Sequence, residues 1–181
     1  MRSPTASIRK ADSLTADVVI VGAGPAGCAA AYDLAVRGIG VLLLDRTEFP
    51  RRKACAGGLT IKTVRTLRFS VTAVIQKTAR NLLVSSRMRH PKLLKNNRPI
   101  CHLVDRTAFD HFCLKKAVAA GARFSVVRRI ERIMETRRDA ALVTDSGNIR
   151  CRFIIGADGV NSRIRQLSGR FPAIRAGFAV E

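Results

Sequence analysis

A buried-strand pattern that runs into three spaced glycines constrains this chain more than any other feature. Asp17–Gly22 (Asp-Val-Val-Ile-Val-Gly) is apolar and rich in β-branched residues, which is typical of a strand buried on both faces of a parallel sheet. Glycine recurs at Gly24 and Gly27, and the alanines within Pro25–Arg37 favour a helix. Because Val41–Asp45 is a second apolar strand, the pattern predicts a βαβ unit.

The glycine spacing suits a turn that binds a pyrophosphate. Gly22 permits a tight turn, Gly24 lets phosphates approach the backbone, and Gly27 lets the helix pack closely on the strand. The helix N-terminus adds unpaired N–H groups and the positive end of a dipole. Asp45 can accept hydrogen bonds from both adenosine ribose hydroxyls and would repel a 2′-phosphate. The predicted dinucleotide site comprises Gly22, Ala23, Gly24, Pro25, Ala26, Gly27, Asp45 and Arg46.

This fingerprint alone does not distinguish NAD from FAD. A second strand–turn–helix pattern, Phe153-Ile-Ile-Gly-Ala-Asp-Gly-Val-Asn-Ser-Arg163, resembles the Asp-Gly motif of flavoprotein monooxygenases and reductases with the p-hydroxybenzoate hydroxylase-like fold. The resemblance implies FAD as the cofactor. It also implies that Asp158 and Gly159 lie near the flavin ribityl and pyrophosphate groups, close to where NAD(P)H docks. The alternative is that Asp158 caps the following helix and contacts no ligand.

A third segment narrows the family. Lys53-Ala-Cys-Ala-Gly-Gly58, which follows the ribose acid, is similar to the Lys-Pro-Cys-Gly-Gly-Gly-like loop that passes over the flavin in the geranylgeranyl reductase family. This chain departs from that pattern at Ala54 and Ala56. These alanines can stiffen or redirect the loop, because alanine tolerates positive φ poorly.

The same resemblance implies roles for two further residues. Cys55 would face the active site as a catalytic residue, and its basic neighbour Lys53 favours the thiolate. The alternative for Cys55 is a small packing residue in a loop. Leu103–Asp110 resembles the family's segment with an arginine close to FAD, which makes Arg106 a cofactor contact; the alternative is a solvated arginine in a basic chain.

The expected fold is α/β: a Rossmann-like FAD/NAD(P)-binding βαβ domain with a parallel sheet and an added β-hairpin or meander, truncated before the substrate domain is complete. Members of the resembled family continue further and carry a Gly-Asp motif that closes over the flavin. We expect residues 1–15 to be a disordered tail and residues 16–181 to form an incomplete FAD-binding domain. Residues 177–181 would begin the missing substrate-domain portion as a strand.

The remaining elements follow from local patterns. Asp105–Ala120 is predicted to be a helix capped by Thr107, with apolar residues at helical spacing on one face. The turn signal Asp145–Asn148 predicts a hairpin. Further helices are expected at Leu59–Arg68 and Asn161–Leu167, strands at Val71–Gln76, Asn81–Ser85, Arg123–Arg128, Ala140–Thr144 and Ile149–Ile155, and a basic loop at Arg87–Pro99.

Charge points to anionic partners. The chain has 33 Lys+Arg against 13 Asp+Glu, a formal net charge of +20. Thirteen of the basic residues fall within residues 49–104, a stretch without Asp or Glu. Cofactor phosphates account for some of these charges, and the predicted loop 87–99 suits an anionic lipid surface. Nucleic acid is the rival partner, but aromatics make up only 5%, Trp is absent, and we recognise no nucleic-acid-binding fold.

Cysteine and histidine spacing argues against metal. Five cysteines without a C-x-x-C pair fit neither a disulfide framework nor a zinc site, and the three histidines lack mutual metal-ligand spacing. We therefore expect no metal site. Cys28, Cys101, Cys113 and Cys151 are expected to be buried. A reducing cytosol is the expected compartment, with peripheral contact to membranes.

Three functions remain open from the sequence. The first is an FAD-binding oxidoreductase resembling geranylgeranyl reductases, which reduces isoprenoid C=C bonds through a flavin hydride, with NAD(P)H as a possible electron donor. The second is an FAD-dependent aromatic-ring monooxygenase of the same fold. The third is a non-catalytic basic fragment. We expect the 181-residue chain to bind FAD weakly and to be weakly active or inactive.

Overall fold

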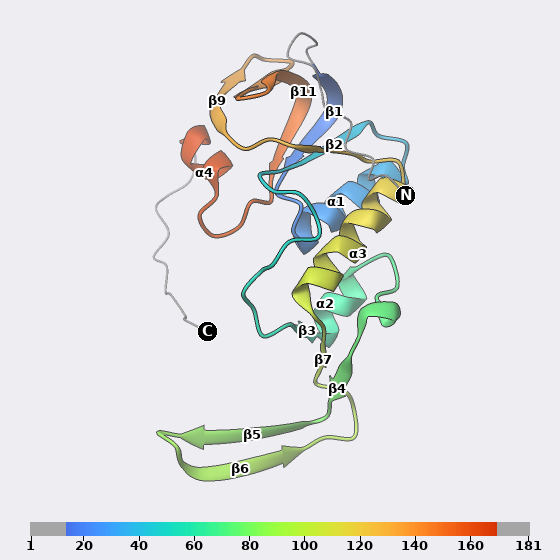
Figure 1. The fold of residues 1–181 in the computed structure, drawn as a ribbon, viewed down its shortest axis with the longest axis vertical. Helices are drawn as coiled ribbons and strands as arrows, with labels where there is room; N and C mark the ends of the chain where they lie inside the picture. Colours follow the sequence, from blue (N-terminus) through green and yellow to red (C-terminus); the bar gives the residue numbers. More distant parts are fainter. Residues whose placement is uncertain (1–13, 170–181) are drawn as a thin grey trace.

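A computed structural model describes residues 14–169, which form a mixed α/β fold around a six-stranded sheet (Figure 1). The sheet order is β8-β2-β1-β11-β10-β9. Strands β8, β2, β1 and β11 run parallel, whereas β11, β10 and β9 form an antiparallel meander. The strands are β1 (Leu14–Val21), β2 (Val41–Asp45), β8 (Arg123–Val126), β9 (Ile130–Glu135), β10 (Ala140–Thr144) and β11 (Gly147–Gly156).

The sheet has a hydrophobic core on each face, because side chains alternate along each strand. Val18 and Ile20 of β1 point into one core, where helices α1 (Pro25–Ala35) and α3 (Arg106–Ala119) pack against the sheet and each other. Val19 and Val21 point into the other core, beside β9, β10 and helix α4 (Arg163–Ser168). The parallel βαβ unit predicted from the sequence is confirmed, with its strand buried on both faces.

Two smaller sheets lie beyond the N-terminal end of α3, which follows directly after strand β7. The first has the order β3-β7-β4, and the second is the two-stranded pair β5-β6, which lies at the bottom of Figure 1. Their elements are β3 (Gly58–Thr60), α2 (Ile61–Thr66), a 3-10 helix (Thr72–Val74), β4 (Lys77–Ala79), β5 (Asn81–Ser86), β6 (Arg89–Lys95) and β7 (Cys101–Leu103).

The basic loop predicted at Arg87–Pro99 is wrong, because most of this segment is strand β6 paired antiparallel with β5. Pro91 suggested a loop, since proline cannot donate to a ladder. It is tolerated because the register shifts between Val84 and Ser86, next to its position. The predicted Asn81–Ser85 strand and the 140–155 hairpin are confirmed.

Three other local predictions need correction, and one strand was missed. The strand predicted at Val71–Gln76 contains a 3-10 helix, and Val71 is buried in the core instead of pairing in a sheet. The helix predicted from Leu59 begins at Ile61, because Leu59 belongs to β3. Asp105 caps α3 in place of Thr107: its carboxylate accepts from the Ala108 N–H at 2.8 Å. The strand β9 was not predicted.

The ends of the chain were predicted only in part. Leu14 and Thr15, assigned to the disordered tail, are the first residues of β1. The rest of that tail and the strand predicted at 177–181 lie outside the described residues. No helix within residues 14–169 is both long and apolar enough to cross a bilayer.

Phe109 provides a test of the packing between α1 and α3. Its side chain is fully buried in the core on that face of the sheet. We expect Phe109→Ala to lower the free energy of unfolding by about 3–5 kcal/mol, since it removes apolar contacts and leaves a cavity. Phe153→Ala is the matched control: Phe153 is 60% exposed, and we expect a loss of about 0.5 kcal/mol or less. Denaturant titration followed by circular dichroism measures both, and equal losses would contradict this packing.

Candidate functional site

The two predicted glycine-rich turns lie against each other at the end of the central strands. Gly22 has φ +102°, and a Cβ on it would lie 2.4 Å from the carbonyl oxygen of Ala157. The Ala157 N–H donates to the Val21 carbonyl at 2.7 Å. The turn after β1 and the turn after β11 are therefore packed backbone to backbone. Only glycine fits at position 22, as the sequence predicted.

Gly27 and Gly24 have different reasons to be glycine. A Cβ on Gly27 would lie 1.8 Å from the Gly22 carbonyl oxygen, so the fold itself requires glycine there. Gly24 has ordinary extended angles (φ −71°, ψ 179°), and the nearest atom to a Cβ there is Arg51 Nη2 at 3.9 Å. The fold does not require glycine at position 24. The space that a side chain would fill remains open beside the start of α1.

The N-terminus of α1 opens onto this space. No side chain caps it, and Pro25 occupies its first turn, where a missing N–H costs no hydrogen bond. Ala26 is exposed in the same turn. The first-turn amides and the positive end of the helix dipole therefore favour an anion at this position.

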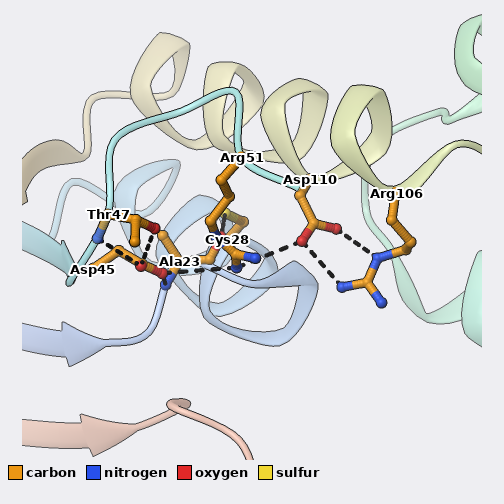
Figure 2. Close-up of polar contacts among 7 residues, drawn as sticks. All are labelled: Ala23, Cys28, Asp45, Thr47, Arg51, Arg106 and Asp110. Atoms are coloured by element: carbon orange, nitrogen blue, oxygen red, sulfur yellow. Dashed lines mark hydrogen bonds and ion pairs between the residues drawn. The ribbon is translucent and has the colours of Figure 1, made fainter. Parts of the chain in front are cut away.

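Asp45 is held beside the turn by three hydrogen bonds (Figure 2). Its Oδ2 atom accepts from the Ala23 N–H at 2.8 Å. Its Oδ1 atom accepts from the Thr47 N–H at 3.2 Å and from the Thr47 hydroxyl at 3.0 Å. These bonds fix the carboxylate at the end of β2, where the sequence predicted a ribose acceptor. Arg46, predicted as a further contact, is exposed next to it.

A charge cluster with little solvent exposure extends from Asp45 to α3 (Figure 2). Asp110 is fully buried, and Arg106 donates to both of its oxygens, at 2.8 and 3.0 Å. Arg51 Nη2 lies 3.5 Å from Asp110 Oδ2 and 3.8 Å from Asp45 Oδ2. Two guanidinium groups and two carboxylates thus balance in charge. Such bidentate, charge-assisted bonds explain how a carboxylate can remain buried inside the fold.

Arg51 has unused hydrogen-bonding capacity. Its Nε atom is buried and has no hydrogen-bond partner within the part of the chain that the structure describes. A buried polar atom without a partner destabilises the fold by about 1–3 kcal/mol. The guanidinium nevertheless lies next to the open space at Gly24, where an anion would meet a positive charge.

Arg106 is therefore not a solvated arginine, because its side chain is only 17% exposed. Hydrogen bonding to Asp110 raises the pKa of Arg106 above its usual value, and a hydrogen bond with Cys55 adds to the shift. Cys55 itself is exposed, and its Sγ accepts from the Gly57 N–H at 3.5 Å. The structure thus brings Cys55 and Arg106, two predicted site residues, into contact.

The loop that carries Cys55 closes on the end of β7. Gly57 has φ +72°, and a Cβ there would lie 2.0 Å from the Val104 carbonyl oxygen. The three non-glycine residues with positive φ in the described chain are Arg87, Met88 and His90. Ala54 and Ala56 are not among them. The two departures from the reductase pattern therefore cause no backbone strain.

Asp158 accepts from the first amides of α4, as in the alternative left open by the sequence, while the N-cap residue is Ser162, whose hydroxyl accepts from the Arg165 N–H at 3.0 Å. One carboxylate oxygen accepts from the Ser162 hydroxyl at 2.6 Å, and the other accepts from the N–H groups of Arg163 at 2.6 Å and Ile164 at 3.2 Å. Gly159 follows with φ +86° and has open space around its Cα. Asp158 therefore orients the turn that packs against Gly22, whether or not it also contacts a ligand.

The remaining cysteines are mostly structural. Cys28, Cys113 and Cys151 are buried as predicted, and Cys101 is half-buried. Burial raises the pKa of the Cys113 thiol to about 12 and that of Cys151 to about 11. Among residues 14–169, no cluster of three or more His, Cys, Asp or Glu side chains is arranged to hold a metal ion.

Three site residues were missed by the sequence analysis: Thr47, Arg51 and Asp110. The i,i+4 spacing of Arg106 and Asp110 on a predicted helix was an available signal for their ion pair. Arg51 gave no such signal, since it is one of thirteen basic residues in an acid-free stretch.

A family comparison agrees with this geometry. The model of the FAD-binding domain family matches residues 15–175. This chain belongs to that family. Its α/β fold with a parallel-dominated sheet is the FAD-binding Rossmann-like fold expected from the sequence.

Three curated relatives match most of the chain. An uncharacterized protein of Methanosarcina barkeri is 37% identical over 91% of this chain and 43% of its own length. The menaquinone reductase of Mycolicibacterium smegmatis is 31% identical over 86% of the chain and 40% of its own length. The geranylgeranyl diphosphate reductase of Rhodobacter capsulatus is 32% identical over 82% and 39%. The chain thus spans about two fifths of the length of these relatives.

Solved structures share the fold at low identity. A geranylgeranyl bacteriochlorophyll reductase-like protein from Thermoplasma acidophilum superposes with a TM-score of 0.78 at 21% identity, covering 91% of this chain and 44% of that one. A flavin-dependent monooxygenase in complex with FAD and substrate gives a TM-score of 0.72 at 19% identity, covering 88% and 33%.

The residues present fit the ADP part of FAD. The open space at Gly24 and the uncapped α1 suit a pyrophosphate, and Asp45 is fixed where ribose hydroxyls can reach it. The Arg51 Nη2 atom adds a positively charged donor beside Gly24. Charge, hydrogen-bonding capacity and space are therefore complementary to the nucleotide half of the cofactor.

Substitutions of Gly24 and Gly27 allow the site and the fold to be tested separately. We expect Gly24→Ala to leave the melting temperature within about 2 °C but to weaken ADP binding about tenfold or more, because a methyl group enters the phosphate space. Gly27→Ala should instead destabilise the whole fold, since its Cβ collides with a backbone oxygen. Thermal unfolding and calorimetric ADP titration measure both effects. Unchanged ADP affinity in Gly24→Ala would exclude this turn as the phosphate site.

Thiol alkylation tests the burial of the cysteines. At pH 8 we expect iodoacetamide to modify Cys55 first and to leave Cys28, Cys113 and Cys151 unmodified, because these thiols are buried and the pKa of Cys113 is about 12. Raising the pH to 9 should not make these thiols reactive, since this pH is still below the pKa of Cys113, about 12, and that of Cys151, about 11. Peptide mass spectrometry gives the order of modification, and 6 M guanidinium is the control in which all five react. Modification of Cys151 as fast as Cys55 in the native protein would contradict this arrangement.

Proposed function

We propose that this chain is the nucleotide-binding part of an FAD-dependent oxidoreductase. The observation that carries the proposal is the open space at Gly24, between an uncapped helix N-terminus and the anchored carboxylate of Asp45. A merely structural glycine turn needs Gly22 and Gly27 but leaves Gly24 unexplained. A bound pyrophosphate explains it, because the phosphate oxygens then approach the backbone directly.

In this proposal each residue has a role in holding the cofactor. Asp45 accepts the adenosine ribose hydroxyls, and the α1 amides beside Gly24 bind the pyrophosphate. Arg51 adds positive charge at the same place, while Asp110 fixes its position from the other side. When bound, FAD supplies hydride transfer. Asp158 holds the second turn in place, near the ribityl part of the cofactor.

The substrate class we propose is an isoprenoid with reducible C=C bonds. The support is the names of two relatives, menaquinone reductase and geranylgeranyl diphosphate reductase. Menaquinone and geranylgeranyl diphosphate both carry isoprenoid chains. NAD(P)H is the electron donor in this proposal. Cys55 is the candidate catalytic residue, since Arg106 lies against its thiol at the edge of the charge cluster.

An aromatic-ring monooxygenase is the second candidate, favoured by the TM-score of 0.72 with a flavin-dependent monooxygenase. The two candidates differ in what accepts electrons from the reduced flavin. Anaerobic mixing of the reduced, FAD-loaded chain with geranylgeranyl diphosphate tests the reductase, and aerobic mixing with a phenol tests the monooxygenase. Prenyl reduction without a hydroxylated aromatic product supports the first.

A nucleotide titration tests the cofactor proposal directly. We expect the 181-residue chain to bind ADP and FAD with affinities within about tenfold of each other, because the described site matches the half that they share. Asp45→Asn should weaken both by about tenfold or more, since hydrogen bonds to a charged acceptor contribute about 1.5–3 kcal/mol. Asp33→Asn is the matched control, because this carboxylate lies on α1 and pairs with Arg68, 3.5 Å away.

Isothermal calorimetry and flavin fluorescence measure these affinities. FAD binding far tighter than ADP would show that the chain also holds the isoalloxazine ring. If neither ADP nor FAD binds, the proposal is overturned, and the non-catalytic basic fragment remains as the interpretation of the sequence. An equal loss in Asp33→Asn would mean that Asp45 acts only through net charge.

A further inference from the structure

Arg51 lies between the two carboxylates of the charge cluster and beside the open space at Gly24 (Figure 2). Its Nη2 atom is 3.8 Å from Asp45 Oδ2 and 3.5 Å from Asp110 Oδ2. The same atom is the nearest neighbour of the position that a Cβ on Gly24 would take, at 3.9 Å. One guanidinium nitrogen therefore borders both the carboxylate that we assign to the ribose and the space that we assign to the phosphates.

Both ion pairs of Arg51 are long. Their distances exceed the about 2.7–3.2 Å that is typical of an N–H···O hydrogen bond. Asp110 does not depend on Arg51 for its position or for neutralisation, because Arg106 donates to both of its oxygens at 2.8 and 3.0 Å. The Arg51 guanidinium can therefore turn toward another anion without leaving a buried carboxylate unpaired.

Asp45 has little acceptor capacity left for a ligand. A carboxylate has about four lone-pair sites, two on each oxygen. Oδ1 already accepts two hydrogen bonds from Thr47, and Oδ2 accepts one from the Ala23 N–H. Because Arg51 is the cation beside Oδ2, a ribose hydroxyl that donates to this oxygen competes with Arg51 for it.

The ring of Phe49 supports the guanidinium from another side. Arg51 Cζ lies 4.8 Å from the centroid of this ring, and the ring of Phe124 packs edge-on against Phe49 with the centroids 5.8 Å apart. A cation–π attraction depends on the distance between the cation and the ring, and it does not fix the direction of the N–H groups. Arg51 can thus exchange one anionic partner for another and still contact Phe49.

We propose that Arg51 makes the nucleotide site selective for ligands that carry phosphate together with ribose. Without phosphate, the guanidinium stays beside Asp45 and opposes the binding of a ribose hydroxyl. Phosphates at Gly24 attract the guanidinium, which leaves Asp45 Oδ2 free for the ribose. ADP and FAD provide this compensation, and adenosine does not. The inference rests on the proposed function and assigns its cofactor selectivity to one residue.

Two ligands added separately test this exchange in the unaltered chain. We expect saturating inorganic pyrophosphate to raise the affinity for adenosine about two- to fivefold, because a long ion pair such as Arg51–Asp45 contributes a factor of about this size. Adenosine is uncharged, so bound pyrophosphate does not attract it directly. Isothermal calorimetry of adenosine binding, with and without pyrophosphate at constant ionic strength, measures the change.

A substitution of Arg51 separates selectivity from a structural role. We expect Arg51→Gln to raise the affinity for adenosine about two- to fivefold, to lower the affinity for ADP about tenfold or more, and to abolish the effect of pyrophosphate on adenosine. Arg52→Gln is the matched control, because it removes the same charge from the next residue, which is exposed. This control should change each affinity less than twofold, and circular dichroism verifies the fold of both variants.

The outcomes distinguish this inference from the proposed function. If pyrophosphate leaves the adenosine affinity of the unaltered chain unchanged, the inference is overturned, whether or not Arg51→Gln folds. A fall in adenosine affinity in Arg51→Gln overturns it as well, since a structural role lowers the affinities for adenosine and ADP alike. Both results leave ADP binding, and with it the proposed function, in place. Binding of neither ADP nor FAD overturns both, and equal effects of Arg52→Gln would mean that net charge alone acts.

Discussion

The contact between two backbone turns, at Gly22 and at Ala157, determines how the rest of the site is arranged. Strand β1 lies between β2 and β11, and the turns that follow β1 and β11 meet at a distance that excludes any side chain on residue 22. This contact directs the N-terminus of α1 toward the end of β2, where Asp45 accepts from the Ala23 N–H. An open space then remains at Gly24, where the nearest atom to a Cβ would be Arg51 Nη2 at 3.9 Å. The candidate cofactor site is thus shaped by close packing at the end of the central sheet.

Ion pairs connect this site to helix α3 and to the loop that carries Cys55. Arg51 comes from the loop after β2, and Asp110 and Arg106 come from α3. A carboxylate inside the fold is tolerated because two guanidinium groups neutralise it. Cys55 contacts the same cluster through Arg106. The charges therefore connect the nucleotide turn, the loop that carries the cysteine and the helix that supports the smaller sheets.

The central strands β1 and β2 could be predicted from the sequence, because they are buried on both faces and therefore form continuous apolar runs, whereas the exposed edge strand β9 was missed. Gly22 and Gly27 could be predicted because each allows a backbone contact that a Cβ would block. Strand β6 was missed for the opposite reason. Neither face of the hairpin is buried, so no alternation of polar and apolar residues marks it, and Pro91 suggested a loop.

The charge cluster could be read from the sequence only in part. The i,i+4 spacing of Arg106 and Asp110 indicates their ion pair, whereas nothing among the thirteen basic residues of 49–104 singles out Arg51. The ion pair of Arg51 with Asp110 depends on how α3 packs beside the nucleotide turn, which only the assembled fold determines. Asp158 shows a different limit: its motif predicted either a ligand contact or a helix cap, and the hydrogen bonds in the structure fill the second role.

The position of Arg51 has a thermodynamic consequence. One guanidinium lies within 4 Å of two carboxylates, one that anchors the nucleotide turn and one that is buried in α3. An anion that binds at Gly24 competes with both carboxylates for the same cation. By linkage, the factor by which the Asp110–Arg51 ion pair changes the affinity for the anion equals the factor by which the bound anion changes the stability of that ion pair. If the cofactor phosphates bind at Gly24 as proposed, their affinity would be coupled to Asp110 of α3 through Arg51, which lies in the loop after β2.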